Sequence, residues 1–341
     1  MTMTKPRTPV PTGLKVGDLV EVRSAEEILA TLDERGELES LPFMPEMLRF
    51  CGQRMTVHKV AHKLCDSLSL SGMHTMPRAV HLTDARCSGA AHGGCQTACN
   101  LFWKEEWLRR VEPGEPSAPS NGFAVSTGAS SAAGRRLLPI LEINARREPD
   151  EDGAPRYACQ ATEILRAAPD VVRLSEVSQY VKDVSTGNAS APFVARSVFV
   201  GVFNRFQSFS RRHLPARLQI RRGQRWGIVE GRSGSSTPTA TLDLQPGELV
   251  RIKSKAEIAE TLNQHLLNRG MGFDAEMARF CGRTAVVKAR VTQCLDERTG
   301  RMLTMKSPCI VLEGVVCEGA FNVACPREFI PFWREIWLER V

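Results

Sequence analysis

The number and spacing of the cysteines in this chain suit metal binding. Eight of the eleven fall into two matched sets of four. Three members of each set correspond at a constant separation of 230 residues, whereas the fourth member, Cys99 or Cys309, differs. Each set contains four thiols although the fourth stands at a different position, so the pattern favours two four-ligand sites. The first set is Cys51, Cys87, Cys95 and Cys99, and the second is Cys281, Cys309, Cys317 and Cys325.

The spacing within each set bears on which metal it would hold. Four thiolates around one zinc ion crowd together at about 2.3 Å from the metal and usually come from closely spaced pairs. Only Cys95 and Cys99 are that close in sequence. A cubane holds its ligands further apart and tolerates wide spacing. The sequence therefore predicts two [4Fe–4S] clusters, with two Zn²⁺ ions as the alternative.

His92 lies between the cysteines of the first set, in the stretch RCSGAAHGGCQTAC. Its counterpart in the second set is Asn322. The imidazole is a candidate ligand, a donor to a sulfur atom or a catalytic acid–base residue, and the competing interpretation is a loop histidine that faces solvent. The remaining cysteines, Cys65, Cys159 and Cys294, have no matched partner and are interpreted as small buried side chains.

A second candidate site is rich in arginine and aromatic residues. Such a mixture can bind phosphate groups or single-stranded nucleic acid. A solvated surface or a salt-bridge seam between domains explains the same composition. No catalytic triad, phosphate loop or dinucleotide fingerprint is visible in the chain. The candidate partner-binding residues are Arg211, Arg212, Arg221 and Arg222.

The two cysteine sets lie in two long segments whose sequences align with each other without gaps. Residues 14–111 (the first segment) align with residues 244–341 (the second segment). Each is predicted to contain a short strand, a helix with a capping box at Ser24 or Ser254, a second short helix, a β-hairpin and a closing aromatic helix. The predicted fold class is α+β: an internal duplication of two small β-barrel-like domains with flanking helices.

The remaining parts of the chain complete the predicted organisation. Residues 1–13 are expected to be a tail, 112–134 a flexible linker and 135–243 a middle domain of mixed structure. The 341 residues are 42% hydrophobic and 24% charged, which indicates a globular protein. No secretory signal or membrane-length apolar run is present, so the cysteines predict a reducing cytoplasm. The oligomeric state is not indicated.

Two strings suggest a family resemblance. RCSGAAHGGCQTACNLFWKEEWL and EGVVCEGAFNVACPREFIPFWREIWLERV resemble a family of uncharacterised bacterial proteins that has no established activity. The resemblance covers both segments and the CQATEILR stretch, and it implies a bacterial, cytoplasmic setting. It implies no substrate.

Two functions follow from these patterns. The first is an iron–sulfur redox protein: a biosynthetic enzyme or oxidoreductase, or its electron carrier, acting on an unidentified small molecule or redox partner. The second is a zinc-stabilised binding module that recognises nucleic acid or another phosphate-bearing partner through its arginines. The net charge of +7 permits nucleic acid but does not require it. Matched thiol sets are rarer than one arginine-rich stretch, so the first function is favoured.

Overall fold

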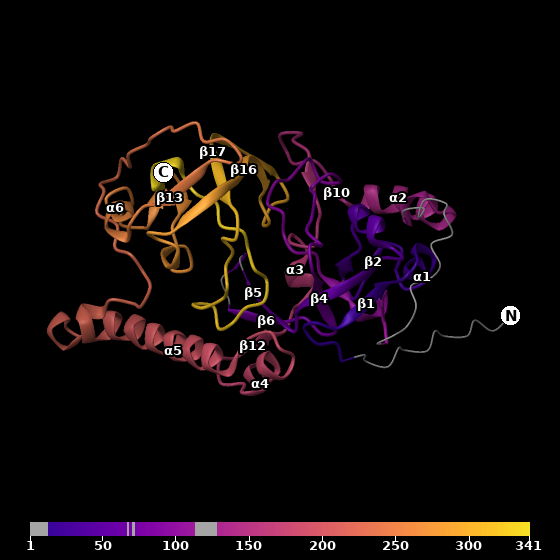
Figure 1. Ribbon diagram of the computed structural model, residues 1–341, viewed down its shortest axis with the longest axis horizontal. Coiled ribbons are helices and arrows are strands. Elements are labelled where there is room, and N and C mark those ends of the chain that lie inside the picture. Colours follow the sequence, from indigo (N-terminus) through magenta and orange to yellow (C-terminus); the bar gives the residue numbers. More distant parts are fainter. Residues whose placement is uncertain (1–12, 67, 70–71, 113–127) are drawn as a thin grey trace. The chain divides into compact units, whose positions relative to one another are not determined.

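A computed structural model gives the architecture of the chain, which is mixed α+β with antiparallel sheets (Figure 1). It describes residues 13–66, 68–69, 72–112 and 128–341. The chain divides into two compact units: unit 1 comprises Met1–Asn188 and Leu295–Met302, and unit 2 comprises Ala189–Cys294 and Leu303–Val341. The boundaries predicted from the sequence stay a prediction.

Unit 1 is built on a five-stranded antiparallel sheet. Its strand order is β8-β7-β4-β1-β9. The strands are β1 (Leu19–Val22), β4 (Arg54–Val60), β7 (Ala79–Leu82), β8 (Trp103–Lys104) and β9 (Leu108–Arg110). Between them lie α1 (Ala25–Leu29), the strands β2 (Glu37–Leu38) and β3 (Leu41–Pro42), and the 3₁₀ helices η1 (Pro45–Phe50) and η2 (Glu105–Trp107).

A second sheet and several helices complete unit 1. The sheet has the order β12-β6-β5, formed by β5 (Lys63–Cys65), β6 (Met73–Thr75) and β12 (Val171–Val172). β10 (Arg146–Arg147) pairs with β11 (Arg156–Tyr157). The helices are η3 (Gly128–Ser130), α2 (Ala132–Asn144), α3 (Ile164–Ala167) and α4 (Ser178–Ser185).

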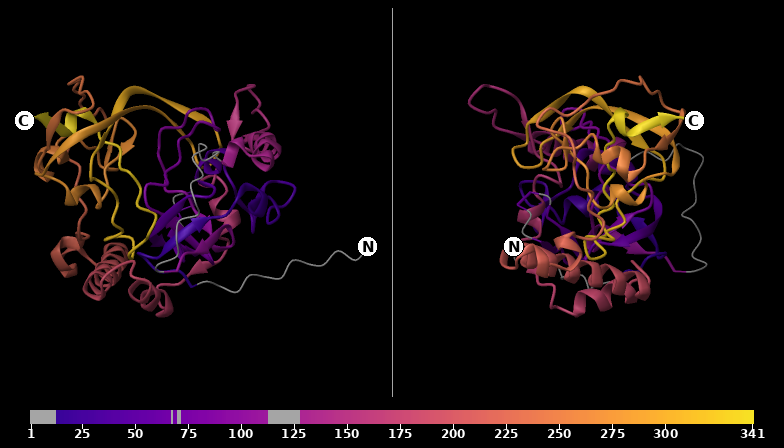
Figure 2. Two further views of the ribbon diagram at one scale, coloured as in Figure 1. Left: turned by 45° about the vertical axis from the view of Figure 1, so that its right-hand side comes forward. Right: turned by 90° about the vertical axis from the view of Figure 1, so that its left-hand side faces the viewer.

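Unit 2 contains a four-stranded sheet of order β17-β16-β13-β18. β16 and β17 run side by side as a long curved hairpin (Figure 2). The strands are β13 (Leu249–Ile252), β14 (Leu267–Asn268), β15 (Met271–Gly272), β16 (Thr284–Leu295), β17 (Met302–Leu312) and β18 (Leu338–Arg340). The helices are α5 (Ala191–His213), η4 (Ala216–Leu218), η5 (Ile220–Gly223), α6 (Lys255–Ala259), η6 (Met277–Arg279) and η7 (Glu335–Trp337).

Several predicted local structures are confirmed. Ser24 and Ser254 both close capping boxes, with Glu27 and Glu257 at the third helical position. The predicted closing aromatic helix is wrong. Trp103 lies on β8 and Trp107 lies on η2, because a strand followed by a 3₁₀ turn also brings residues four apart to one side.

The tryptophans form the centre of both cores. Trp103 and Trp107 are fully buried and meet Phe43 edge-on, with ring centroids 6.1 and 5.1 Å away. Trp333 and Trp337 are also fully buried and meet Phe273 in the same way, at 6.2 and 5.4 Å. Edge-to-face aromatic pairs add to the free energy gained by burial alone.

Parts of the predicted tail and linker fall outside the described residues. These parts are residues 1–12 and 113–127. The end of the predicted linker forms η3 and the start of α2, which Ser131 caps by accepting the Gly134 amide. Among the described helices, none combines the length and the apolar character required to cross a membrane.

Candidate metal centre

The cysteine loop of the first segment owes its shape to a glycine. Gly89 has a φ of +72°, and its carbonyl oxygen accepts the amides of His92 and Gly94. A Cβ atom added at Gly89 would lie 1.9 Å from the carbonyl oxygen of Cys95, so no other residue fits this turn. The Cys87 amide donates to the Cys99 carbonyl at 2.8 Å and closes the loop.

This loop brings a thiol and an imidazole beside a carboxylate. Glu46 on η1, Cys87 and His92 each offer a ligand atom, and these atoms all lie within 4.8 Å of one another. The Cys87 thiol donates to Glu46 Oε1 at 3.1 Å, and His92 Nε2 lies 3.4 Å from Cys87 Sγ. His92 Nδ1 is 3.9 Å from Glu46 Oε1.

Two buried polar atoms of this cluster have no hydrogen-bond partner among the described residues. The His92 side chain is 1% exposed and that of Glu46 is 4% exposed. Glu46 Oε2 and His92 Nδ1 are buried without a hydrogen-bond partner among the described residues. Leaving such atoms unpaired costs about 1–3 kcal/mol each. A bound cation would satisfy them, so these three residues fit a metal ion.

Without a metal ion, the surroundings of Cys87 keep its thiol protonated. Burial raises the pKa of Cys87 well above its usual range, and the Glu46 carboxylate raises it further. A divalent cation reverses this balance because it deprotonates a coordinating thiol. Metal binding at this site would therefore release the Cys87 proton.

Cys95 lies on the same loop, but its pKa is shifted in the opposite direction to that of Cys87. Burial opposes its ionisation, but hydrogen bonds with His92, Thr97 and the Leu295 amide outweigh burial and lower the pKa of Cys95 to about 7. The Thr97 hydroxyl is 3.2 Å from Cys95 Sγ, and the Leu295 amide donates to it at 3.3 Å. Cys95 is thus a second thiol beside His92, and its acidity differs from that of Cys87.

Sequence reasoning missed two residues of this neighbourhood. Glu46 belongs to the EMLRFCG string that recurs as EMARFCG, so the matched segments held a signal for it. Cys159 was interpreted as a core cysteine. The thiols of Cys99 and Cys159 both raise the pKa of Cys87, and Cys95 raises that of Cys159. No sequence signal connects Cys159 with the loop, because the fold alone brings it there.

Cys51 is the remaining member of the first predicted set. It follows η1 directly and is buried against η3. A Cβ atom added at Gly128 would lie 2.4 Å from Cys51 Cβ. Burial raises the pKa of Cys51 to about 12, as expected for a thiol packed among apolar atoms.

The second segment repeats the loop but not the cluster. The Gly319 carbonyl accepts the amides of Asn322 and Ala324, and the Cys317 amide donates to the Phe329 carbonyl. Asn322 stands where His92 would be, and Asn side chains are not among the usual zinc ligands. Glu276, the counterpart of Glu46, accepts the Phe321 amide at 2.6 Å.

The other cysteines of the second set occupy separate surroundings. Cys281 packs against the main core of unit 2, and burial raises its pKa to about 11. Cys309 is fully buried in a small cluster with Val291 and Val311. Cys325 is buried beneath Gly319, where an added Cβ would lie 2.5 Å from the Cys325 amide nitrogen. The two four-cysteine sites stay a prediction.

The structure shows where the His92 side chain lies. Its side chain is almost completely buried, so the interpretation of a solvent-facing loop histidine is wrong. A role as ligand or as donor to sulfur agrees with its position beside Cys87. Its predicted catalytic role stays a prediction.

The predicted arginine site lies at the end of α5 and in η5. Arg211 and Arg212 occupy the last turn of α5, and both are exposed, as is Arg221. The side chain of Arg222 lies outside the described part of the structure. The buried Gln207 amide donates to the carbonyls of Ile220 and Gln224, which ties η5 to α5.

No family model, curated protein or solved structure matches the chain.

Proposed function

We propose that this chain is a metalloprotein whose centre lies in the first segment, at Glu46, Cys87 and His92. The observation that carries the proposal is the trio itself, in which His92 is buried and all three ligand atoms lie within 4.8 Å of one another. The unpartnered Glu46 Oε2 and His92 Nδ1 support it, because buried polar atoms are almost always satisfied.

The donor set favours Zn²⁺. Thiolate, imidazole and carboxylate together suit a borderline-soft ion, whereas an all-oxygen site would suit magnesium or calcium. Cys95 would complete four protein ligands, which is the ligand number of a structural zinc site. Such a site would hold the cysteine loop against η1. We accordingly favour the zinc-stabilised binding module over the redox protein that the sequence favoured.

An iron–sulfur redox function remains the second candidate, and a specific observation supports it. Cys99 and Cys159 lie close enough to Cys87 to raise its pKa, and Cys95 lies close enough to Cys159 to do the same. A [4Fe–4S] cluster in unit 1 would use these four thiols, with Cys159 in place of Cys51. The second cluster predicted on Cys281, Cys309, Cys317 and Cys325 belongs to this candidate.

We also propose that the two segments are an internal duplication of one small β-barrel-like domain. Recurrence of the capping boxes, the tryptophan cores and the glycine-based loops at a separation of 230 residues supports this origin. A cytoplasmic location is part of the same proposal. It is supported by eleven cysteines that are all free thiols, which persist in reducing compartments.

Metal analysis of protein purified without oxygen tests the proposal. We expect about one zinc per chain and no colour. About four irons and four sulfides would favour the second candidate, and about eight of each would favour the two clusters predicted from sequence. Protein that takes up none of these metals when supplied with them would contradict both candidates.

A further inference from the structure

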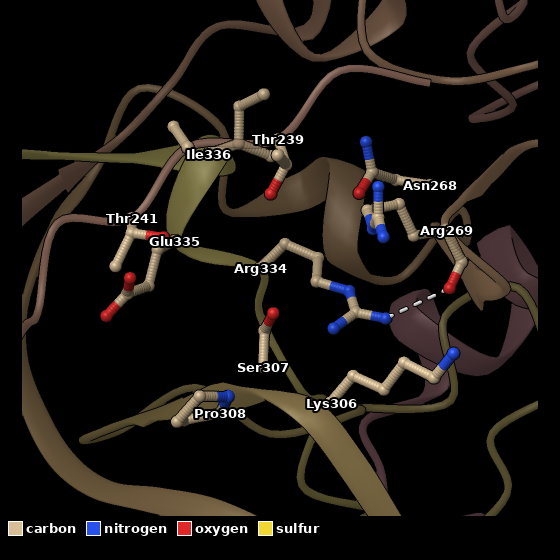
Figure 3. Close-up of a pocket in the computed structure, with 11 residues that line it drawn as sticks. Thr239, Thr241, Asn268, Arg269, Lys306, Ser307, Pro308, Arg334, Glu335 and Ile336 are labelled. Atoms are coloured by element: carbon tan, nitrogen blue, oxygen red, sulfur yellow. Dashed lines mark hydrogen bonds between the residues drawn. The ribbon is translucent and has the colours of Figure 1, made fainter. Parts of the chain in front are cut away.

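Unit 2 contains a pocket of about 210 Å³ whose lining is strongly basic (Figure 3). Its size suits a small ligand, since sites for drug-sized molecules begin at about 300 Å³. Hydroxyl groups and three cations line it. The cations are Arg269, Lys306 and Arg334, and the hydroxyls belong to Thr239, Thr241 and Ser307.

Arg334 occupies the middle of this pocket and is poorly satisfied. Its Nη2 donates to the Arg269 carbonyl at 3.2 Å (Figure 3). Among the described residues, the partner of its Nη1 is the Cys309 sulfur, at 3.9 Å. Its Nε is buried and has no hydrogen-bond partner among the described residues. A guanidinium normally binds carboxylate or phosphate oxygens through paired N–H groups.

In the first segment, the residue that corresponds to Arg334 pairs with a carboxylate. Lys104 corresponds to Arg334 and is fully buried. Its Nζ donates to Glu39 Oε2 at 2.7 Å, and Arg78 pairs with the other oxygen of the same carboxylate. Burial opposes ionisation of Glu39, but Lys104 and Arg78 outweigh burial and lower the pKa of this carboxyl. Here the protein supplies its own anion.

The second segment lacks that anion. Arg269 stands where Glu39 would be, 230 residues on, and Lys306 stands where the first segment has Met76. The one acid that lines the pocket, Glu335, is already engaged. It accepts the amides of Leu242 and Leu244 at 2.8 and 3.0 Å. Three cations therefore face the pocket without a free carboxylate among its lining residues.

We propose that this pocket binds the phosphate group of a small molecule, which takes the place that the Glu39 carboxylate holds in the first segment. Three cations favour a dianionic phosphate over a single carboxylate, because each further cation adds to the attraction. The hydroxyls of Thr239, Thr241 and Ser307 would donate to its remaining oxygens. The proposal concerns unit 2 alone and does not depend on the metal centre.

Calorimetric titration of the full chain with inorganic phosphate tests the proposal. We expect binding with a Kd on the order of 1 mM, as suits a single small anion. A phosphate monoester such as glycerol phosphate should bind at least as tightly, and succinate should bind more weakly. Succinate binding tighter than phosphate would overturn the assignment of a phosphate group.

One substitution separates binding from folding. Arg269→Glu copies the residue of the first segment and gives Arg334 an internal partner, so the variant should fold and melt no lower than the parent. Phosphate binding should weaken by at least about tenfold. Lys288→Glu makes the same charge change at an exposed position on β16 outside the pocket lining and should bind normally. Equal loss in both variants would show non-specific attraction and overturn the proposal, as would unchanged binding in Arg269→Glu.

Discussion

The two cysteine loops share a backbone and differ in their side chains. The carbonyls of Gly89 and Gly319 each accept two amides, at the same 3.1 and 2.9 Å in both loops. In the first loop a buried imidazole follows, and in the second the amide side chain of Asn322 follows. The comparison teaches that glycine specifies the turn, whereas the residue three positions later decides which chemistry the turn can support.

The surroundings of the loops differ as well. In unit 1 a Cβ added at Gly93 would meet the Tyr157 ring, and Cys95 accepts the Leu295 amide. In unit 2 the buried Ser197 hydroxyl of α5 donates to the Ala320 carbonyl at 3.0 Å. In the first loop His92 Nδ1 has no hydrogen-bond partner among the described residues, whereas the second loop is held by hydrogen bonds to α5.

Removing a core tryptophan should have the largest effect and should be similar in both segments. Trp103→Ala and Trp333→Ala each delete a fully buried indole. The expected loss is about 3–5 kcal/mol of unfolding free energy in each unit. Denaturant unfolding followed by fluorescence and circular dichroism measures it. A loss below about 1 kcal/mol in either variant would break the equivalence of the two cores.

A buried ion pair of the first segment has no counterpart in the second segment, and breaking it should lower the free energy of unfolding. Lys63 Nζ lies 2.6 Å from Asp183 Oδ2, and both side chains are fully buried. Gln293 stands at the place of Lys63 in the second segment. Asp183→Asn should cost about 3 kcal/mol, because it removes the carboxylate that compensates the buried lysine charge.

Two further variants sharpen this prediction. Lys63→Met combined with Asp183→Asn should recover part of the loss, since no uncompensated charge remains. Asp170→Asn, at an exposed position in the same unit, should change the free energy by less than about 0.5 kcal/mol. If Asp183→Asn were as mild as Asp170→Asn, the ion pair would not hold α4 to β5.

The titration of Cys95 should show a smaller effect. Its pKa of about 7 means that metal-free protein carries substantial thiolate at neutral pH, whereas an ordinary cysteine carries little. Ultraviolet thiolate absorbance should therefore rise with a midpoint near pH 7. Cys95→Ser should remove this step. His92→Ala should move it to higher pH, because it deletes a hydrogen bond that favours the thiolate. A first midpoint above pH 8.5 in the parent protein would contradict the account.

Local structure was largely predictable from the sequence. The capping boxes at Ser24 and Ser254 follow from a short pattern in which neighbouring residues decide the outcome. The closing aromatic segment was not predictable in this way. Trp103 and Trp107 fit the spacing of a helix, but burial of both rings against Phe43 is achieved by a strand and a 3₁₀ turn.

The candidate site was predictable only in part, for a related reason. Cys87, His92 and Cys95 lie within nine residues, so their types and spacing point to one loop. Glu46 and Cys159 reach that loop through tertiary packing, which spacing does not encode. Cys51 has a matched partner at Cys281 and is buried against η3, and its predicted role as a ligand stays a prediction. A repeated position records shared structure as readily as shared chemistry.

The most direct test of the central claim is the metal content of the parent protein and of His92→Asn, which gives the first loop the side chain of the second. After anaerobic purification with zinc supplied, the parent should hold about one ion per chain. His92→Asn should bind it at least about 100-fold more weakly, because even changes outside the ligand shell cost 10- to 100-fold in affinity. His265→Asn, at an exposed histidine of the second segment, should behave as the parent. Full metal content in a folded His92→Asn variant would contradict the proposed centre.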